Sequence, residues 1–153
     1  MAMRAYFAAV MLHDALPTGN HDGHADNLIA IRREFGIGAD DVTFLPYWDK
    51  TGLEAADNDI KLAGWQRPGK LLLLVANFGE QQTVQVTLDL DKLGWKAATL
   101  AVSDPEQGQS LTVTGQDGPV TITSDAPPPK LDGTTLTVPV GRHDYRLVVL
   151  EKQ

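Results

Sequence analysis

Residues 71–90, with the sequence LLLLVANFGEQQTVQVTLDL, decide the fold class. Residues 71–75 are all apolar, which is typical of a strand with both faces buried. After a turn at residues 78–80, apolar and polar side chains alternate from residue 83 to residue 90. That alternation is the pattern of a strand with one buried and one exposed face. Together the two patterns predict a β-sheet protein in which residues 71–75 lie at the centre.

Further strands are expected around this stretch, because turn residues recur about every ten positions after residue 59. Short strands at that spacing are typical of antiparallel sandwiches and barrels. The predicted fold class is all-β: an antiparallel β-sandwich of about seven or eight strands with a short N-terminal α/β appendage. The expected strands are residues 60–66, 71–77, 83–90, 97–102, 111–114, 120–123, 135–140 and 145–150.

The first third of the chain predicts the appendage. Residues 5–12, AYFAAVML, are eight consecutive apolar residues and are interpreted as a buried strand. A polar loop follows at residues 17–23, and the apolar spacing of residues 25–35 predicts an amphipathic helix. We therefore divide the chain into an appendage at residues 1–48 and a sandwich domain at residues 49–153. An unpaired apolar strand would expose backbone hydrogen-bonding groups and apolar surface, which another chain could cover. We therefore predict a homodimer that pairs through residues 5–12.

Composition excludes several classes of function. The chain has 153 residues, a formal net charge of −7 and a pI near 4.9, which disfavours a nucleic-acid partner. It has no cysteine, so thiolate catalysis and cysteine-ligated metal clusters are excluded. No apolar run approaches the roughly 20 residues that cross a bilayer, so no membrane partner is expected. No phosphate-binding glycine loop is present, and no cofactor is expected.

Three segments carry a family resemblance: FLPYWD at residues 44–49, WQRPGKLLLLVANFG at residues 65–79 and VPVGRHDYRL at residues 138–147. Together they resemble the C-terminal end of large bacterial glycoside hydrolases of the family 123-like group. In that group a TIM barrel is followed by a β-sandwich. The resemblance implies a non-catalytic accessory domain of a soluble bacterial enzyme, secreted or periplasmic if that enzyme degrades polysaccharide. Its partners would be carbohydrate or a glycosidase catalytic barrel. The paired acids of the barrel are not among these residues, so hydrolytic activity is not implied.

Aromatic side chains are the candidate carbohydrate contacts, because a flat ring matches the C–H face of a sugar. The candidates are Tyr47, Trp48, Trp65 and Trp95. The alternative is that Trp48 and Trp65 pack the sandwich against the appendage, as large aromatic residues usually do in cores.

Histidines and acids cluster near the N-terminus, at His13, Asp14, His21 and His24. Imidazole and carboxylate are ligands for zinc, copper or iron, so a metal site is one interpretation and a polar loop is the other. A small carbohydrate-active enzyme built on this loop is an alternative function. Glycoside hydrolysis usually needs two facing carboxylates, and no spacing singles out such a pair. The remaining acids, Asp104 and Glu106 among them, are interpreted as solvated surface.

Overall fold

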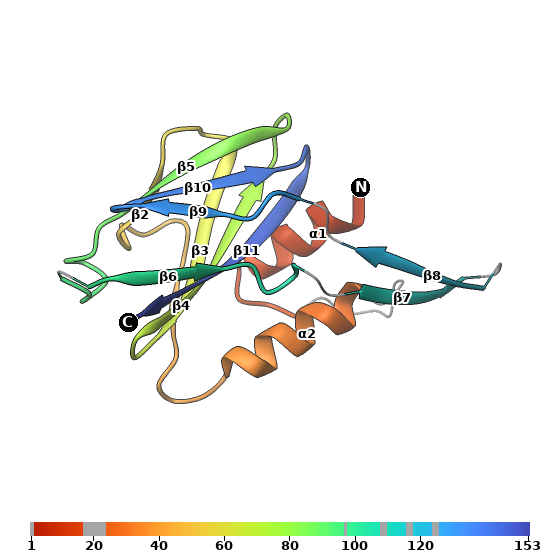
Figure 1. The fold of residues 1–153 in the computed structure, drawn as a ribbon, viewed down its shortest axis with the longest axis horizontal. Helices are drawn as coiled ribbons and strands as arrows, with labels where there is room; N and C mark the ends of the chain where they lie inside the picture. The colour runs from red at the N-terminus through yellow and green to blue at the C-terminus, as the bar shows by residue number, and fades with distance from the viewer. Residues whose placement is uncertain (1, 17–23, 97, 108–109, 116–117, 124–125) are drawn as a thin grey trace.

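A computed structural model describes residues 2–16, 24–96, 98–107, 110–115, 118–123 and 126–153. The chain is mostly β: two antiparallel sheets pack as a sandwich, and two N-terminal helices precede them (Figure 1). The helices are α1 (Ala2–Met11) and α2 (His24–Phe35). The strands are β1 (Thr43–Leu45), β2 (Leu53–Ala55), β3 (Ile60–Arg67), β4 (Lys70–Asn77), β5 (Gln82–Leu88), β6 (Leu100–Ser103), β7 (Ser110–Gly115), β8 (Gly118–Thr123), β9 (Lys130–Asp132), β10 (Thr135–Val140) and β11 (Asp144–Lys152).

The five-stranded sheet has the order β1-β3-β4-β11-β6, and all neighbouring strands are antiparallel. In its middle strand, β4, residues 71–76 are all apolar and buried, because both faces of the strand are covered. Leu71, Leu73 and Val75 join the core between the two sheets. Leu72 and Leu74 join a second core beneath the helices. The predicted central position of residues 71–75 is confirmed.

The four-stranded sheet has the order β2-β5-β10-β9. In β5 the apolar residues Val84, Val86 and Leu88 are buried against the first sheet, and the polar residues between them are more exposed. The predicted alternation is confirmed. The predicted sandwich is likewise confirmed at this level, although the three-residue strands β1, β2 and β9 carry too little pattern to be predicted.

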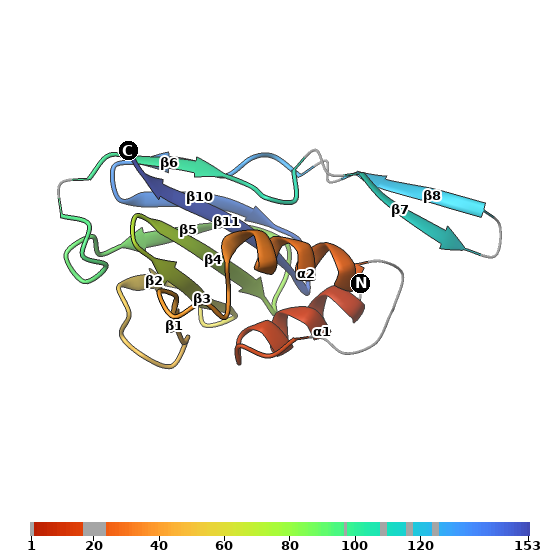
Figure 2. The same ribbon diagram turned by 90° about the horizontal axis from the view of Figure 1, so that it is seen from below.

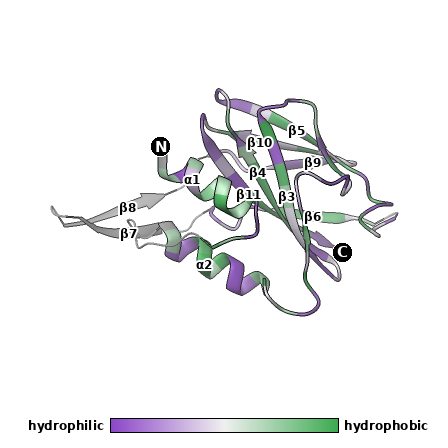
Figure 3. Cartoon of the chain, turned by 180° about the vertical axis from the view of Figure 1, so that it is seen from behind, coloured by the Kyte–Doolittle hydropathy of each residue, from purple (hydrophilic) through white to green (hydrophobic). Residues whose placement is uncertain are grey.

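The two helices lie on the outer face of the five-stranded sheet, so the molecule has three layers (Figure 2). Within α1, Phe7, Ala8 and Met11 are buried against β4 and β11. The hydropathy of α2 is mixed, with Leu28 and Ile31 buried (Figure 3). Neither helix is long and apolar enough to cross a membrane, and that statement covers the described residues only.

The predicted strand at residues 5–12 is wrong, because α1 occupies most of this segment. A uniformly apolar run of eight residues has no period that separates a strand from a buried helix. Alanine and methionine favour the helix, and Val10 is the single β-branched residue between Ala2 and Leu12. The helix at residues 25–35 is confirmed as α2. The homodimer that depended on a free N-terminal strand loses that basis, since the apolar face of α1 is already covered.

The expected division at residue 48 falls inside shared structure. β1 precedes residue 48, yet it pairs with β3 at Phe44 opposite Trp65. Both helices also share their core with the five-stranded sheet. The β7–β8 hairpin pairs with neither sheet (Figure 2).

Candidate functional site

Two neighbouring aromatic side chains lie at the surface in the loop that follows β1. Tyr47 is 38% exposed and Trp48 is 57% exposed, the highest value among the large apolar side chains that the structure describes. Their ring centroids are 5.0 Å apart in an edge-to-face arrangement. Exposed aromatic rings of this size are more typical of binding surfaces than of the rest of a surface. We call Tyr47 and Trp48 the aromatic pair.

The side chains of His13 and Phe44 pack against Trp48 and fix the position of the aromatic pair. The imidazole of His13, at the end of α1, stacks on the Trp48 indole with centroids 5.7 Å apart and an interplanar angle of 26°. Phe44 contacts Trp48 edge-on at 6.3 Å and packs against the buried Trp65 at 5.6 Å. His13 therefore covers one face of the Trp48 indole, while the Trp48 side chain as a whole stays more than half exposed.

A groove of 520 Å³ runs beside the aromatic pair. It lies between β2, an edge strand of the four-stranded sheet, and the first half of β3. β1 pairs only with the stretch of β3 from Gly64 to Gln66, so the first half of β3 has no strand on this side. Polar side chains from the β1–β2 loop, β2, the turn before β3 and the start of β3 line the groove. They are Asp49, Thr51, Glu54, Asp57, Asn58 and Lys61.

Asp57 is the best-fixed of these polar groups. Its Oδ1 accepts the backbone N–H of Asp59 at 2.8 Å, and its Oδ2 accepts the Gln82 amide at 2.9 Å. The backbone hydrogen bond from Asp59, followed by that from Gln82, lowers the pKa of Asp57 below its ordinary value. Lys61 Nζ donates to the Asn58 carbonyl at 2.8 Å. The groove therefore presents an ionised carboxylate with a fixed orientation.

The structure places Trp65 and Trp95 away from the surface, which corrects their selection as carbohydrate contacts. Trp65 is 1% exposed, beneath the helices, and its indole N–H donates to Asp14 Oδ1 at 2.7 Å. Trp95 is 4% exposed and belongs to the core between the sheets. Neither ring offers a face on which a sugar could stack. Of the four predicted aromatic residues, the structure brings only Tyr47 and Trp48 together.

The predicted metal ligands have other partners where they are described. Asp14 Oδ1 accepts Arg32 Nη2 at 3.0 Å as well as the Trp65 indole, and His13 stacks on Trp48. His21 and the side chain of His24 lie outside the described residues. Within the described residues, no group of three or more metal-binding side chains comes together. The metal site stays a prediction.

Two acids that we interpreted as solvated surface are buried, and this interpretation is corrected. Asp104 and Glu106 are each 8% exposed and follow β6. Asp104 pairs with the guanidinium of Arg146 on β11. Glu106 accepts two hydrogen bonds from Arg4 of α1, at 3.2 and 3.3 Å. No local spacing reveals these pairs, because their partners are 42 and 102 positions away.

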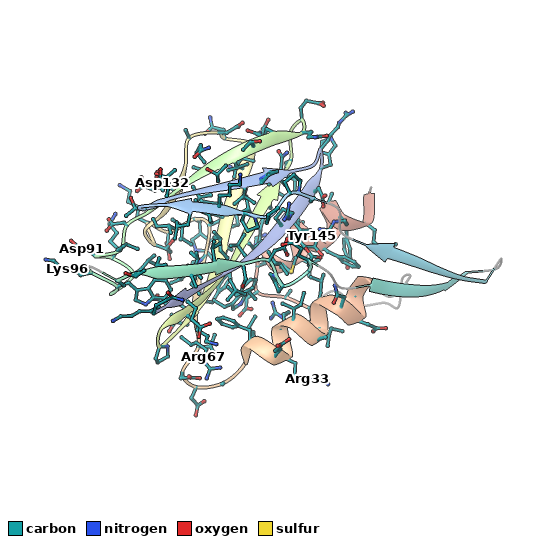
Figure 4. All side chains as sticks on the ribbon, viewed as in Figure 1. Arg33, Arg67, Asp91, Lys96, Asp132 and Tyr145 are labelled. Carbon is teal, nitrogen blue, oxygen red and sulfur yellow. The ribbon has the colours of Figure 1, made fainter. Side chains whose placement is uncertain are left out.

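Arg4 joins this loop to the start of β11. Its guanidinium lies 4.0 Å from the centroid of the Tyr145 ring and also pairs with Asp144. Tyr145, the second residue of β11, belongs to the core that this strand shares with α1 (Figure 4). Burial, followed by the charge of Glu106, raises the pKa of Tyr145. The phenol therefore stays protonated and acts as part of the core.

A second cavity, of 560 Å³, lies between α2 and the β3–β4 turn. Its basic side chains already have partners: Arg67 pairs with Asp41, and Lys70 pairs with Glu151. Arg67 Nη1 also donates to the Phe35 carbonyl at the end of α2 (Figure 4). No exposed aromatic residue lines this cavity, so the groove beside the aromatic pair is the better candidate site.

No protein-family model matches this chain, and no curated protein matches it at a significant level. The resemblance to glycoside hydrolases therefore stays a prediction, which rests on the three quoted segments. One of them contains the aromatic pair, the second contains β4, and the third contains the second half of β10 and the start of β11.

Proposed function

We propose that this chain is a non-catalytic accessory β-sandwich domain of a glycoside hydrolase and that it binds carbohydrate through the aromatic pair. The observation that carries the proposal is the exposure of Trp48 and Tyr47 directly beside a polar groove. The partner implied by the resemblance is a glycosidase catalytic barrel, whose glycan substrate the domain would also hold.

The chemistry of the site suits a sugar. The apolar C–H face of a pyranose can stack on the Trp48 indole, and its hydroxyl groups then need hydrogen-bonding partners at the rim. The carboxylates of Asp49 and Glu54 and the amide of Asn58 can supply them. The groove volume falls within the range of roughly 300–1,000 Å³ that is usual for small-ligand sites.

Asp57, the best-fixed carboxylate of the groove, is poorly suited to be the general acid of a glycosidase. The general acid of a glycosidase needs a raised pKa so that it is protonated before the reaction. The pKa of Asp57 in the groove is instead lowered. The buried acids Asp104 and Glu106 are each paired with an arginine and do not line the groove.

The test is affinity electrophoresis of the chain through gels that contain one soluble polysaccharide each, followed by calorimetry with the best ligand. Trp48→Ala should weaken binding about tenfold or more, as expected for a central aromatic contact. Tyr6→Ala is the matched control, because Tyr6 is 47% exposed on α1 but lies outside the groove. The proposal fails if no polysaccharide retards the chain, or if Trp48→Ala binds as the unsubstituted chain does.

A further inference from the structure

The groove carries an excess of negative charge that the protein does not neutralise. Asp49, Glu54 and Asp57 line it, together with one cation, Lys61. None of the ion pairs found among the described residues includes any of these four side chains. Lys61 instead directs its ammonium group to the Asn58 carbonyl. The three carboxylates therefore present their charge to whatever enters the groove.

The aromatic pair, like the carboxylates, favours a positively charged ligand. The faces of tryptophan and tyrosine rings carry partial negative charge, so a ligand cation within about 6 Å of a ring centroid is attracted to them. Trp48 and Tyr47 line the same groove as the three acids. A ligand with both an apolar sugar face and a positive charge would satisfy the rings and the carboxylates together.

We infer that the groove selects glycans whose sugars carry free, protonated amino groups over neutral glycans, and that it rejects glycans built from uronic acids. This inference rests on the proposed function and names its ligand class. Each ammonium group replaces a hydroxyl or an acetamide and meets a carboxylate at the rim. A uronic acid in the same position would place a fourth carboxylate beside Asp49, Glu54 and Asp57, in a chain whose net charge is already −7.

The experiment compares three hexasaccharides of the same length by calorimetry at pH 6: glucosamine, N-acetylglucosamine and galacturonic acid oligomers. The ring size and the number of sugars are matched, and the charge differs. At low salt the glucosamine oligomer should bind roughly fivefold more tightly than its acetylated form, as expected for one or two exposed charge pairs. Half-molar salt should remove most of that preference, because it screens exposed charges. The galacturonic acid oligomer should not bind.

Glu54→Gln and Asp49→Asn keep the size of each side chain and remove its charge. Within the described residues neither side chain makes a hydrogen bond or ion pair, so the fold should not change. The double variant should lose the preference for glucosamine, so that it binds the glucosamine and N-acetylglucosamine oligomers with equal affinity. Asp132→Asn is the control, since Asp132 is an exposed acid on β9, the edge strand opposite β2 (Figure 4). This control should keep the preference.

The possible results distinguish a failure of the charge preference from a failure of carbohydrate binding itself. Equal binding of all three oligosaccharides, tighter binding of the galacturonic acid oligomer, or an unchanged preference in the double variant overturns the inference about charge and leaves carbohydrate binding in place. The absence of binding to all three, together with no retardation in any polysaccharide gel, refutes the proposed function and this inference with it.

Discussion

Replacing Asp14 with alanine should destabilise the fold, although this residue lies at the end of a helix and is part of an exposed loop. Its Oδ1 accepts two hydrogen bonds, from Arg32 Nη2 at 3.0 Å and from Trp65 Nε1 at 2.7 Å. The Arg32 guanidinium also lies 5.0 Å from the centroid of the Trp65 ring. Asp14 therefore joins the end of α1 to α2 and β3.

The magnitude follows from what the substitution leaves behind. The Arg32 side chain is 9% exposed, and its Nη1 already has no hydrogen-bond partner among the described residues. Asp14→Ala would leave this cation unpaired and the Trp65 N–H buried without an acceptor. Because the Asp14 side chain is itself 39% exposed, water can reach part of the site and reduce the loss. We expect the free energy of unfolding to fall by about 2–3 kcal/mol.

The assay is urea denaturation followed by circular dichroism, with Asp132→Ala as the control. Asp14→Asn should cost about 1 kcal/mol, since the amide keeps an acceptor for Trp65 but loses the charge that pairs with Arg32. A change below 0.5 kcal/mol for Asp14→Ala, in the range of ordinary surface substitutions at roughly ±0.5 kcal/mol, would refute the structural role of Asp14.

Three further predictions test the core and the groove. Asp104→Ala should lower the free energy of unfolding by about 3–5 kcal/mol in urea denaturation, because it leaves the Arg146 guanidinium buried without its carboxylate; a loss below 1 kcal/mol would contradict the pair. Gly64→Ala should cost about 1–3 kcal/mol, since its Cβ would meet Leu71 Cδ1 at 2.9 Å; an unchanged melting temperature would show that the core yields there. Asp57 has a depressed folded-state pKa, so its stabilising effect is present above the unfolded pKa and is lost as pH falls through the folded one. Asp57→Asn should therefore be less stable than the unsubstituted chain at neutral pH, and this difference should shrink as the pH falls below the unfolded pKa; an unfolding difference that does not change with pH would contradict this.

The sequence predicts the sandwich well because the spacing of apolar residues along each strand shows which faces of that strand are buried. Residues 71–75 are apolar on both faces, and β5 alternates as a half-buried strand must. The N-terminal segment could not be predicted in the same way. Residues 5–12 are apolar without a period, and only the packing of α1 on β4 and β11 shows which side chains share a face.

The candidate site could be predicted only in part. Trp48 and Trp65 are the same residue type, and their exposure differs because β3 is covered by helices whereas the β1–β2 loop is not. The burial of Asp104 and Glu106 depends on Arg146 and Arg4, which are far away in the chain. Contacts between residues so far apart in the sequence produce no local spacing pattern from which they could be predicted. The groove likewise depends on the short pairing of β1 with β3.

Fluorescence quenching tests the central claim most directly, since Trp48 is the exposed tryptophan of three, and Trp65 and Trp95 are buried. Acrylamide should quench one accessible population in the free chain, and that population should be missing in Trp48→Phe. A saturating oligosaccharide, glucosamine hexasaccharide first, should protect the same population. An oligosaccharide that binds in calorimetry while Trp48 stays fully open to acrylamide would contradict the account.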